Sequence, residues 1–389
     1  MMKNLLIALA LVLPAANAAA QQNLKLGTLE IHPQVAMQAS YDNNIYLVKQ
    51  APKGAMISRN AFGVNLLNKV GSRLDLRGGY TLELLGYGAN KANNDAAHHL
   101  ANLGAEWRLP KNMSVSMDDS WMQTTDQATS ELTARAKRVQ NTAAFGFEAP
   151  IRGKFGFNLA AQHTYHNYLI GANSSLDRQE MLVGGDITYK LQPKTRLFVA
   201  YRYGTLAYKE AADETNDSTY NNVDFGITGN IAPKITGTAR AGVQYRNYAN
   251  DLGTADNDVT TAGYSLQFVW KPVEKTDVVI YGKRGNVESS YGTSRYYTST
   301  TGDLTVSRQV RKVKASLGFN YETNAYPELS AGTSKKRLDT NTGFRCNAEY
   351  SVQKWLKADL GYTYKHRASN ENDFEYSDNI VGLQLKGMF

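Results

Sequence analysis

Apolar and polar residues alternate with a period of two along most of this chain. In one stretch every second position is apolar or small: Ile235, Gly237, Ala239, Ala241, Val243 and Tyr245. The positions between them are mostly polar. Alternation that lasts ten or more residues predicts a β-strand with one apolar and one polar face. The same pattern recurs from the N-terminal part of the chain to its end, for example in residues 74–82, 155–161, 181–189, 223–231, 313–321 and 356–364.

Short polar turns separate these stretches at nearly regular intervals. Five prolines mark them, with gaps of 40, 43, 40 and 39 residues: Pro110, Pro150, Pro193, Pro233 and Pro272. Two further turns, near 307–311 and 351–354, continue the series without proline. Between consecutive turns lie one strand, a longer polar loop and a returning strand. The longest loops are expected at Gln123–Lys137, Ala207–Thr219 and Glu322–Lys336.

A repeat of about 40 residues is also typical of a soluble β-propeller blade. A blade fits four short strands into that length, whereas each repeat here holds two strands of ten or more residues. Strands of about 9–11 residues are long enough to cross a membrane when tilted. Counting the segments predicts about 18 strands, an even number as in bacterial outer-membrane barrels.

The first twenty residues predict a secretory signal peptide. Lys3 supplies a positive charge, residues 5–13 form an apolar stretch, and Ala16-Asn17-Ala18 or the next alanines offer a small-residue cleavage site. We therefore expect a signal peptide at residues 1–20 and one barrel domain at 21–389, because no linker or shift in composition divides the rest. Cys346 is the single cysteine, so no intrachain disulfide is expected.

Two features favour a lipid-facing apolar side over a dry protein core. Tyrosines gather at the loop-side ends of strands, while Trp and Phe lie beside the short turns, as in the two aromatic girdles of a membrane barrel. The polar face also carries many charges, which would be costly in a dry core but not in a water-filled lumen. The prediction is an all-β protein, a transmembrane antiparallel up-and-down β-barrel.

The last residue of the chain is aromatic and ends an alternating strand. Val381, Leu383, Leu385, Gly387 and Phe389 share one face of it. A terminal Phe in this setting resembles the signal by which bacterial barrels are inserted into the outer membrane, so Phe389 is the candidate insertion signal. Gly387 departs from the bulky residue often found at that position.

The first predicted strand and loop provide a family resemblance. The segment IHPQVAMQASYDNNIYLVKQ contains a proline and the element Tyr41-Asp42-Asn43-Asn44 before the first loop. It resembles the putative β-barrel porin-2 family, in which a similar element has a second Asp. The resemblance implies an outer-membrane barrel, and some members are linked to the production and export of exopolysaccharide.

A barrel of about 18 strands is wide enough for an aqueous channel. Ten basic residues of the polar face are candidates for lining it: Arg73, Arg77, Arg196, Arg202, Arg240, Arg246, Lys312, Lys314, Arg345 and Lys357. Basic residues around a pore favour anions. Carboxylates on the same face leave open a second interpretation, in which mixed charges merely hydrate the wall. No loop guarantees a plug, although Gln123–Lys137 is long enough to fold inward.

Other functions have weaker signals. His163 and His166 lie near a strand end, but no nucleophile and base can be placed together from the sequence. His98 and His99 are adjacent and so point to opposite faces of a strand. We expect no enzyme activity, no cofactor and no metal site, since neither a Cys/His cluster nor a calcium loop is present. The cations are scattered, which does not favour nucleic acid.

The sequence thus predicts a porin-like channel in the bacterial outer membrane for hydrophilic solutes. The alternatives are a component of exopolysaccharide export and a closed barrel with a structural or surface-interaction role. Expected partners are outer-membrane lipid, hydrophilic solutes or polysaccharide, and the barrel-assembly machinery. An oligomer is possible.

Overall fold

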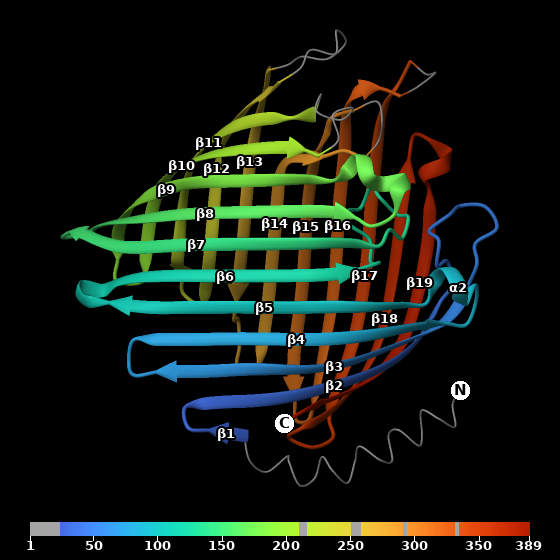
Figure 1. Ribbon diagram of the computed structural model, residues 1–389, viewed down its shortest axis with the longest axis horizontal. Coiled ribbons are helices and arrows are strands. Elements are labelled where there is room, and N and C mark those ends of the chain that lie inside the picture. The colour runs from blue at the N-terminus through green and yellow to red at the C-terminus, as the bar shows by residue number, and fades with distance from the viewer. Residues whose placement is uncertain (1–23, 210–215, 250–257, 291–293, 331–333) are drawn as a thin grey trace.

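The computed structural model describes residues 24–209, 216–249, 258–290, 294–330 and 334–389. The expected signal peptide at residues 1–20 lies outside the described residues. In the described parts the chain forms one antiparallel sheet that closes on itself (Figure 1). Strands β2 to β19 follow each other in chain order around the ring, and β19 pairs with β2. The predicted barrel of about 18 strands is confirmed.

The first half of the barrel alternates short turns with longer loops. Its strands are β2 (Leu29–Asp42), β3 (Ala55–Val70), β4 (Leu74–Tyr87), β5 (Ala96–Leu109), β6 (Met113–Thr124), β7 (Arg138–Arg152), β8 (Phe155–Tyr168), β9 (Arg178–Gln192) and β10 (Thr195–Tyr208). A short strand β1 (Leu24–Leu26) pairs with β2 outside the ring. Three short helices lie in this half: α2 (Lys91–Asn94), η1 (Pro110–Asn112) and η2 (Gly171–Leu176).

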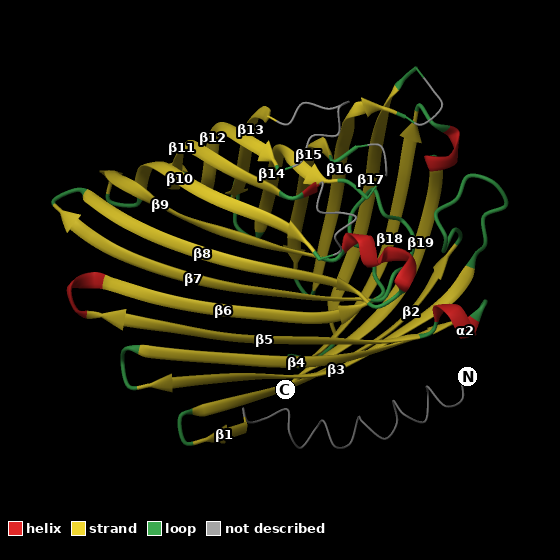
Figure 2. Ribbon diagram, turned by 45° about the horizontal axis from the view of Figure 1, so that its top comes forward, coloured by secondary structure: helices red, strands yellow, loops and turns green. Residues whose placement is uncertain are grey.

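The second half repeats the same plan. Its strands are β11 (Ser218–Ala232), β12 (Ile235–Tyr248), β13 (Asp258–Trp270), β14 (Thr276–Glu288), β15 (Tyr296–Val310), β16 (Val313–Leu329), β17 (Lys336–Ser351), β18 (Leu356–Ser369) and β19 (Tyr376–Met388), and η4 (Asn372–Phe374) precedes β19. Figure 2 shows the short turns gathered at one end of the barrel and the long loops at the other.

One predicted loop was too long. We expected loop residues from Glu322 to Lys336, but β16 continues to Leu329. The register explains the difference, because Glu322 to Ala325 pair with β15 on one side and β17 on the other. The polar sequence Glu-Thr-Asn faces the lumen in part, so it lacks the apolar alternation that marks the other strands.

The apolar face of each strand points outward. Phe225, Val243 and Leu383 are more than half exposed, whereas their sequence neighbours are turned into the barrel. Trp107 and Phe155, beside the short turns, are also exposed to the outside. Large apolar side chains on an outer surface require lipid as their solvent. Among the described residues no helix is long and apolar enough to cross a membrane.

The C-terminal residue closes the barrel at the short-turn end. Its backbone N–H donates to the carbonyl of Pro33 in β2 at 3.0 Å, and its ring stacks on Trp355 with centroids 5.4 Å apart. A side chain at position 387 would meet the Phe389 ring at 3.2 Å and Val35 at 3.1 Å. The space needed by the terminal ring therefore accounts for Gly387.

Candidate functional site

The inner wall carries eight of the ten basic candidates. Alternation with outward apolar neighbours turns these side chains toward the lumen: Arg77, Arg196, Arg202, Arg240, Arg246, Lys314, Arg345 and Lys357. Arg73 and Lys312 instead lie in the short turns before β4 and β16. A turn at the barrel end interrupts the period of two, and the sequence pattern did not locate that interruption to the residue.

Most of these cations are paired with a carboxylate on a strand one to three places away in the sheet. Measured between nitrogen and oxygen, the separations are 2.8 Å for Arg196–Glu148, 2.7 Å for Arg202–Asp224 and 2.9 Å for Lys357–Glu349. Further ion pairs join Arg77 to Asp118, Arg246 to Glu288, and Arg345 to Asp303. The inner wall is therefore a lattice of mixed charge, with fewer free cations than the sequence list implies.

Residues 125–137, here called the crossing loop, connect β6 to β7 and fold into the barrel. His98 of β5, only 1% exposed, anchors the start of this loop: its Nε2 accepts from the backbone N–H of Thr125 at 3.0 Å. Asp126 then accepts from Arg59 of β3 at 2.8 and 3.1 Å. Burial opposes ionisation of Asp126, but Arg59 outweighs it and holds the pKa of Asp126 below its ordinary value of 3.8.

The middle of the crossing loop reaches the opposite wall. The buried carboxylate of Glu131 accepts from the hydroxyls of Ser289 and Ser290, at 2.7 and 2.8 Å, beyond the end of β14. The hydroxyl of Ser130 donates to Glu322 of β16, and Arg367 of β18 donates to the Ser130 carbonyl at 2.9 Å. Since β6 and β16 face each other across the ring, the loop divides the long-loop half of the lumen.

One side of this division is packed shut. Arg337 and Asp339 of β17 form a buried ion pair at 2.6 Å. The Arg337 guanidinium lies over the rings of Tyr326 and Phe374, 4.8 and 3.4 Å from their centroids. Arg367 lies over the Tyr376 ring in the same layer. Cations stacked on aromatic rings and paired with carboxylates fill the space between β16 and β19.

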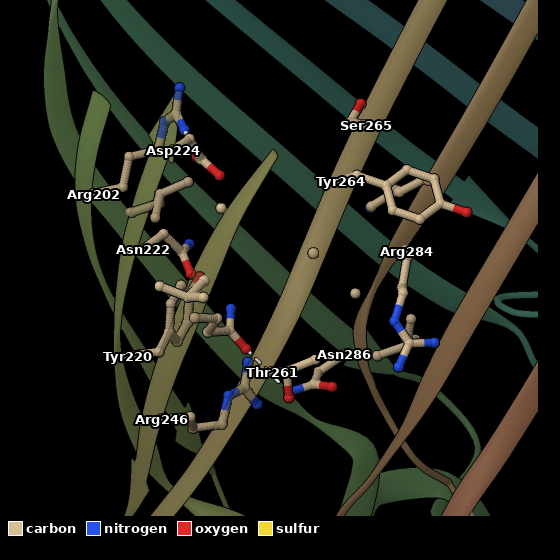
Figure 3. A pocket seen from close by; sticks show the side chains of 18 of the residues that line it. Arg202, Tyr220, Asn222, Asp224, Arg246, Thr261, Tyr264, Ser265, Arg284 and Asn286 are labelled. Carbon is tan, nitrogen blue, oxygen red and sulfur yellow. Dashed lines mark hydrogen bonds and ion pairs between the residues drawn. The ribbon is translucent and has the colours of Figure 1, made fainter. Parts of the chain in front are cut away.

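The other side holds a cavity of about 510 Å³ along the inner wall from β9 to β14 (Figure 3). Arg202 and Asp224 lie at one end of it and Arg246 at the other. The charged residues that line it are six cations, Arg178, Arg202, Arg240, Arg246, Lys283 and Arg284, and three carboxylates, Glu180, Asp224 and Glu288. The lining of the cavity thus has an excess of three positive charges.

A glycine allows an aromatic ring to lie flat on this wall. A Cβ at position 204 would fall 2.1 Å from the ring of Tyr220, so any larger residue must displace that ring. The Arg246 guanidinium lies 4.9 Å from the centroid of the same ring. Gly204 therefore fixes how Tyr220 and Arg246 are presented to the cavity.

The wall is incomplete between β13 and β14, a stretch here called the seam. Backbone pairing covers Tyr264 to Trp270 of β13, and Asp258–Gly263 pairs with β12 alone. Side chains bridge the seam instead: the Asn286 amide donates to Thr261 at 2.9 Å and to Gln244 at 3.2 Å. Figure 3 shows Asn286 and Thr261 meeting there. Unpaired backbone in a membrane barrel must face water or protein, which places the seam beside the wet cavity.

The histidines lie apart. His98 faces inward, whereas His99 faces outward and shares a hydrogen bond of 2.8 Å with Tyr80, so their predicted opposite directions are confirmed. By the same alternation His163 and His166 lie on opposite faces of β8. Among the described residues, no group of three or more His, Cys, Asp or Glu side chains has the arrangement of a metal site.

Comparison with known families identifies the chain. Residues 19–389 match the family model described as putative beta-barrel porin 2. The chain belongs to this family. The family resemblance that the Tyr41-Asp42-Asn43-Asn44 element indicated is thus confirmed, and it extends over nearly the whole chain. This family member is a β-barrel of the bacterial outer membrane, surrounded by lipid. No curated protein sequence matches it.

Solved structures share its architecture. OccAB3 of Acinetobacter baumannii superposes with a TM-score of 0.50 at 8% identity, covering 94% of this chain and 100% of that one. OccK3 (OpdO) of Pseudomonas aeruginosa superposes with a TM-score of 0.50 at 9% identity, covering 92% and 95%. At such low identity these likenesses show the fold alone.

The sequence left undecided whether the crossing loop folds into the barrel, and no pattern in it indicated the seam. The only sequence signal for the loop was its length. The Glu131 contacts join residues more than 150 positions apart, so no local pattern could reveal them. The seam has no signal either, because the residues of one strand do not show how far it pairs with the next.

Proposed function

We propose that this porin-family barrel is a water-filled channel through which small hydrophilic solutes diffuse across the outer membrane, with a weak preference for anions. The observation that supports it is the polar cavity beside the crossing loop, whose lining has six cations and three carboxylates. Basic residues around a narrow passage attract anions and repel cations. The pairing of Arg202 with Asp224 and of Arg178 with Glu180 keeps the preference small.

Single-channel recording tests this proposal. The mature protein is refolded in detergent, inserted into a planar bilayer and measured under a salt gradient. We expect stable conductance steps and a reversal potential of the sign produced by an anion-selective pore. A folded, heat-modifiable protein that never conducts would contradict the open channel and favour a closed structural barrel. A cation-selective reversal potential would contradict the role given to the cavity.

Export of an exopolysaccharide is the second candidate, and the Tyr220 ring on the cavity wall is the observation that favours it. Aromatic rings stack on sugar faces, and Gly204 holds this ring against the wall. Reversible block of the current by acidic oligosaccharides would support the saccharide function. Currents that are indifferent to every saccharide would leave the diffusion of small solutes as the function.

Delivery to the membrane is proposed to follow the usual route for barrels. Residues 1–20 would be removed as a signal peptide, leaving 21–389 as one barrel domain. Phe389 would be presented to the barrel-assembly machinery as the end of the last strand. We assign the barrel no catalytic role and no cofactor.

A further inference from the structure

One carboxylate lies on the outer face of the barrel wall, in the middle of β6. Asp119 is directly opposite Leu103 of β5, whose side chain is 68% exposed on the lipid-facing surface. Residues directly opposite each other on antiparallel strands share one face of the sheet. The neighbouring Asp118 points the other way, into the lumen, where it pairs with Arg77. Asp119 therefore faces the surface that lipid would cover.

Lipid is a poor solvent for the Asp119 side chain. On the outer face of β6 this residue stands between Met117 and Trp121, within the apolar band. The Asn141 amide of β7 donates to its two carboxylate oxygens at 3.1 and 3.0 Å, and no ion pair of Asp119 exists among the described residues. One neutral donor does not neutralise a charge, and charged residues on the lipid face destabilise a barrel. A partner that covers this face would remove the carboxylate from lipid.

A complementary group lies on the same face, two strands away. His163 of β8 is directly opposite Ala143 of β7, and Ala143 is directly opposite Asp119. His163 is also opposite Met181 of β9, which is 51% exposed. Neighbouring strands are about 4.8 Å apart, so Asp119 and His163 are about 10 Å from each other, with the small Ala143 side chain between them. The two groups are therefore too far apart to pair within one barrel.

The surface around these groups is hollow. A cavity of about 620 Å³ lies against it. Its outward-facing lining includes three small side chains and three larger, exposed ones: Ala105, Ala143, Ala161, Leu103, Met117 and Phe145. Small residues let two membrane-embedded surfaces approach each other closely. A lipid chain would fill the hollow but would leave Asp119 and His163 without polar partners.

We propose that this face, from β5 to β8, is the interface at which a second copy of the chain docks in the membrane. The face carries both members of an ion pair that cannot form within one barrel, so it is complementary to itself. Two copies related by an axis along the membrane normal turn Asp119 of one barrel toward the partner's His163. The walls come closest at Ala143, between these two groups. The carboxylate then leaves lipid, and each barrel keeps its own lumen.

Disulfide cross-linking in outer membranes tests this interface. The exposed Cys346 is first removed by Cys346→Ser, so that each variant carries one thiol. In that background, Ala143→Cys should give a covalent dimer on oxidation, because the two copies meet at this position. Ala241→Cys, on the lipid-facing side of β12 and outside the proposed interface, is the matched control and should stay monomeric. Equal dimer yields at the two positions, or none at either, would overturn the proposal.

Light scattering in mild detergent gives a second readout. The unaltered protein should be dimeric or larger, and Asp119→Leu and Ala143→Leu should each weaken association more than about tenfold. Both replacements suit a lipid-facing position, so the heat-modifiable folded band should remain. The exchange Asp119→His with His163→Asp should restore the association that either single replacement loses. A monomeric unaltered protein, or dimers that survive both leucine variants, would overturn the proposal. Conductance of the single barrel is a separate measurement, so this proposal and the proposed channel function can fail independently.

Discussion

At the scale of single residues, the ion preference of the lumen depends on which charged side chains remain unpaired. Arg240 has no ion pair among the described residues, and its guanidinium lies 5.6 Å from the centroid of the Phe198 ring. Arg202, on the neighbouring wall, is neutralised by Asp224 at 2.7 Å. An unpaired cation in a confined passage attracts anions and repels cations. The potential of a paired cation is largely cancelled by the opposite charge of its partner.

Arg240→Gln should therefore reduce anion selectivity. It removes one of the three excess charges of the cavity, so we expect the reversal potential under a salt gradient to move about a third of the way to zero. Arg311→Gln, in a short turn outside the cavity, removes the same charge and should leave the reversal potential in place. An unchanged reversal potential for Arg240→Gln would show that ions take another path.

At the scale of elements, the crossing loop depends on contacts at its start and at its middle. Its start is held by His98 and Arg59, and its middle by Ser289 and Ser290 beyond β14. Hydrogen bonds to a charged group contribute about 1.5–3 kcal/mol each. A loop held at both places should narrow the lumen permanently, whereas a loop held only at its start should move and make the current noisy.

Glu131→Gln should weaken the far contact of the crossing loop with Ser289 and Ser290, while the Ser130 contacts remain. The glutamine amide lacks the negative charge that strengthens the hydrogen bonds from the two serines. We therefore expect larger and noisier conductance steps in planar bilayers. Glu328→Gln, near the end of β16, is the control, because no hydrogen bond of that carboxylate is described. Identical currents from Glu131→Gln and the unaltered protein would show that the loop does not limit conduction.

The start of the crossing loop should resist moderate acid. Since the pKa of Asp126 is lowered in the folded protein, the contribution of its carboxylate to stability is complete above about pH 3.8. That contribution is lost only as the pH falls through the lowered pKa. Conductance should stay constant from pH 8 to about pH 5 and change only in stronger acid. At neutral pH, Asp126→Asn should already have the conductance that the unaltered protein has in strong acid. A transition near pH 6 would contradict this assignment.

At the scale of the whole molecule, closure is uneven around the ring. Thirteen residue pairs join β12 to β13, whereas seven join β13 to β14. The unpaired half of the seam is closed by side chains such as Asn286. Local opening of a protein begins where hydrogen-bonded backbone is sparse and exposed to water.

The backbone amides of the seam should therefore exchange their hydrogens before those of the rest of the barrel wall. We expect peptides covering Asp258–Gly263 and Gly285–Glu288 to exchange faster than the matching half of β12, measured by mass spectrometry in detergent. Asn286→Ala should speed the exchange further, since it removes the bridge to Thr261 and Gln244. Uniform protection along β13 would show that the seam is closed in solution.

The sequence alone determined the architecture, the outward apolar face and the family. Alternation such as that from Ile235 to Tyr245 repeats along the chain, and a period of two fixes which side chains share a face. Strand order followed from it, because each strand pairs with the next through a short turn or a loop. Even the terminal strand could be recognised from its last residues, although the reason for Gly387 could not.

Only the tertiary structure decided what the lumen contains. Glu131 meets Ser289, and Asn43 meets Asn379, because closure of the ring brings together residues that are 158 and 336 positions apart. No local pattern encodes such contacts, since each residue alone is an ordinary polar loop or strand residue. The pairing of Arg202 with Asp224, which sets the strength of the anion preference, likewise depends on strand register.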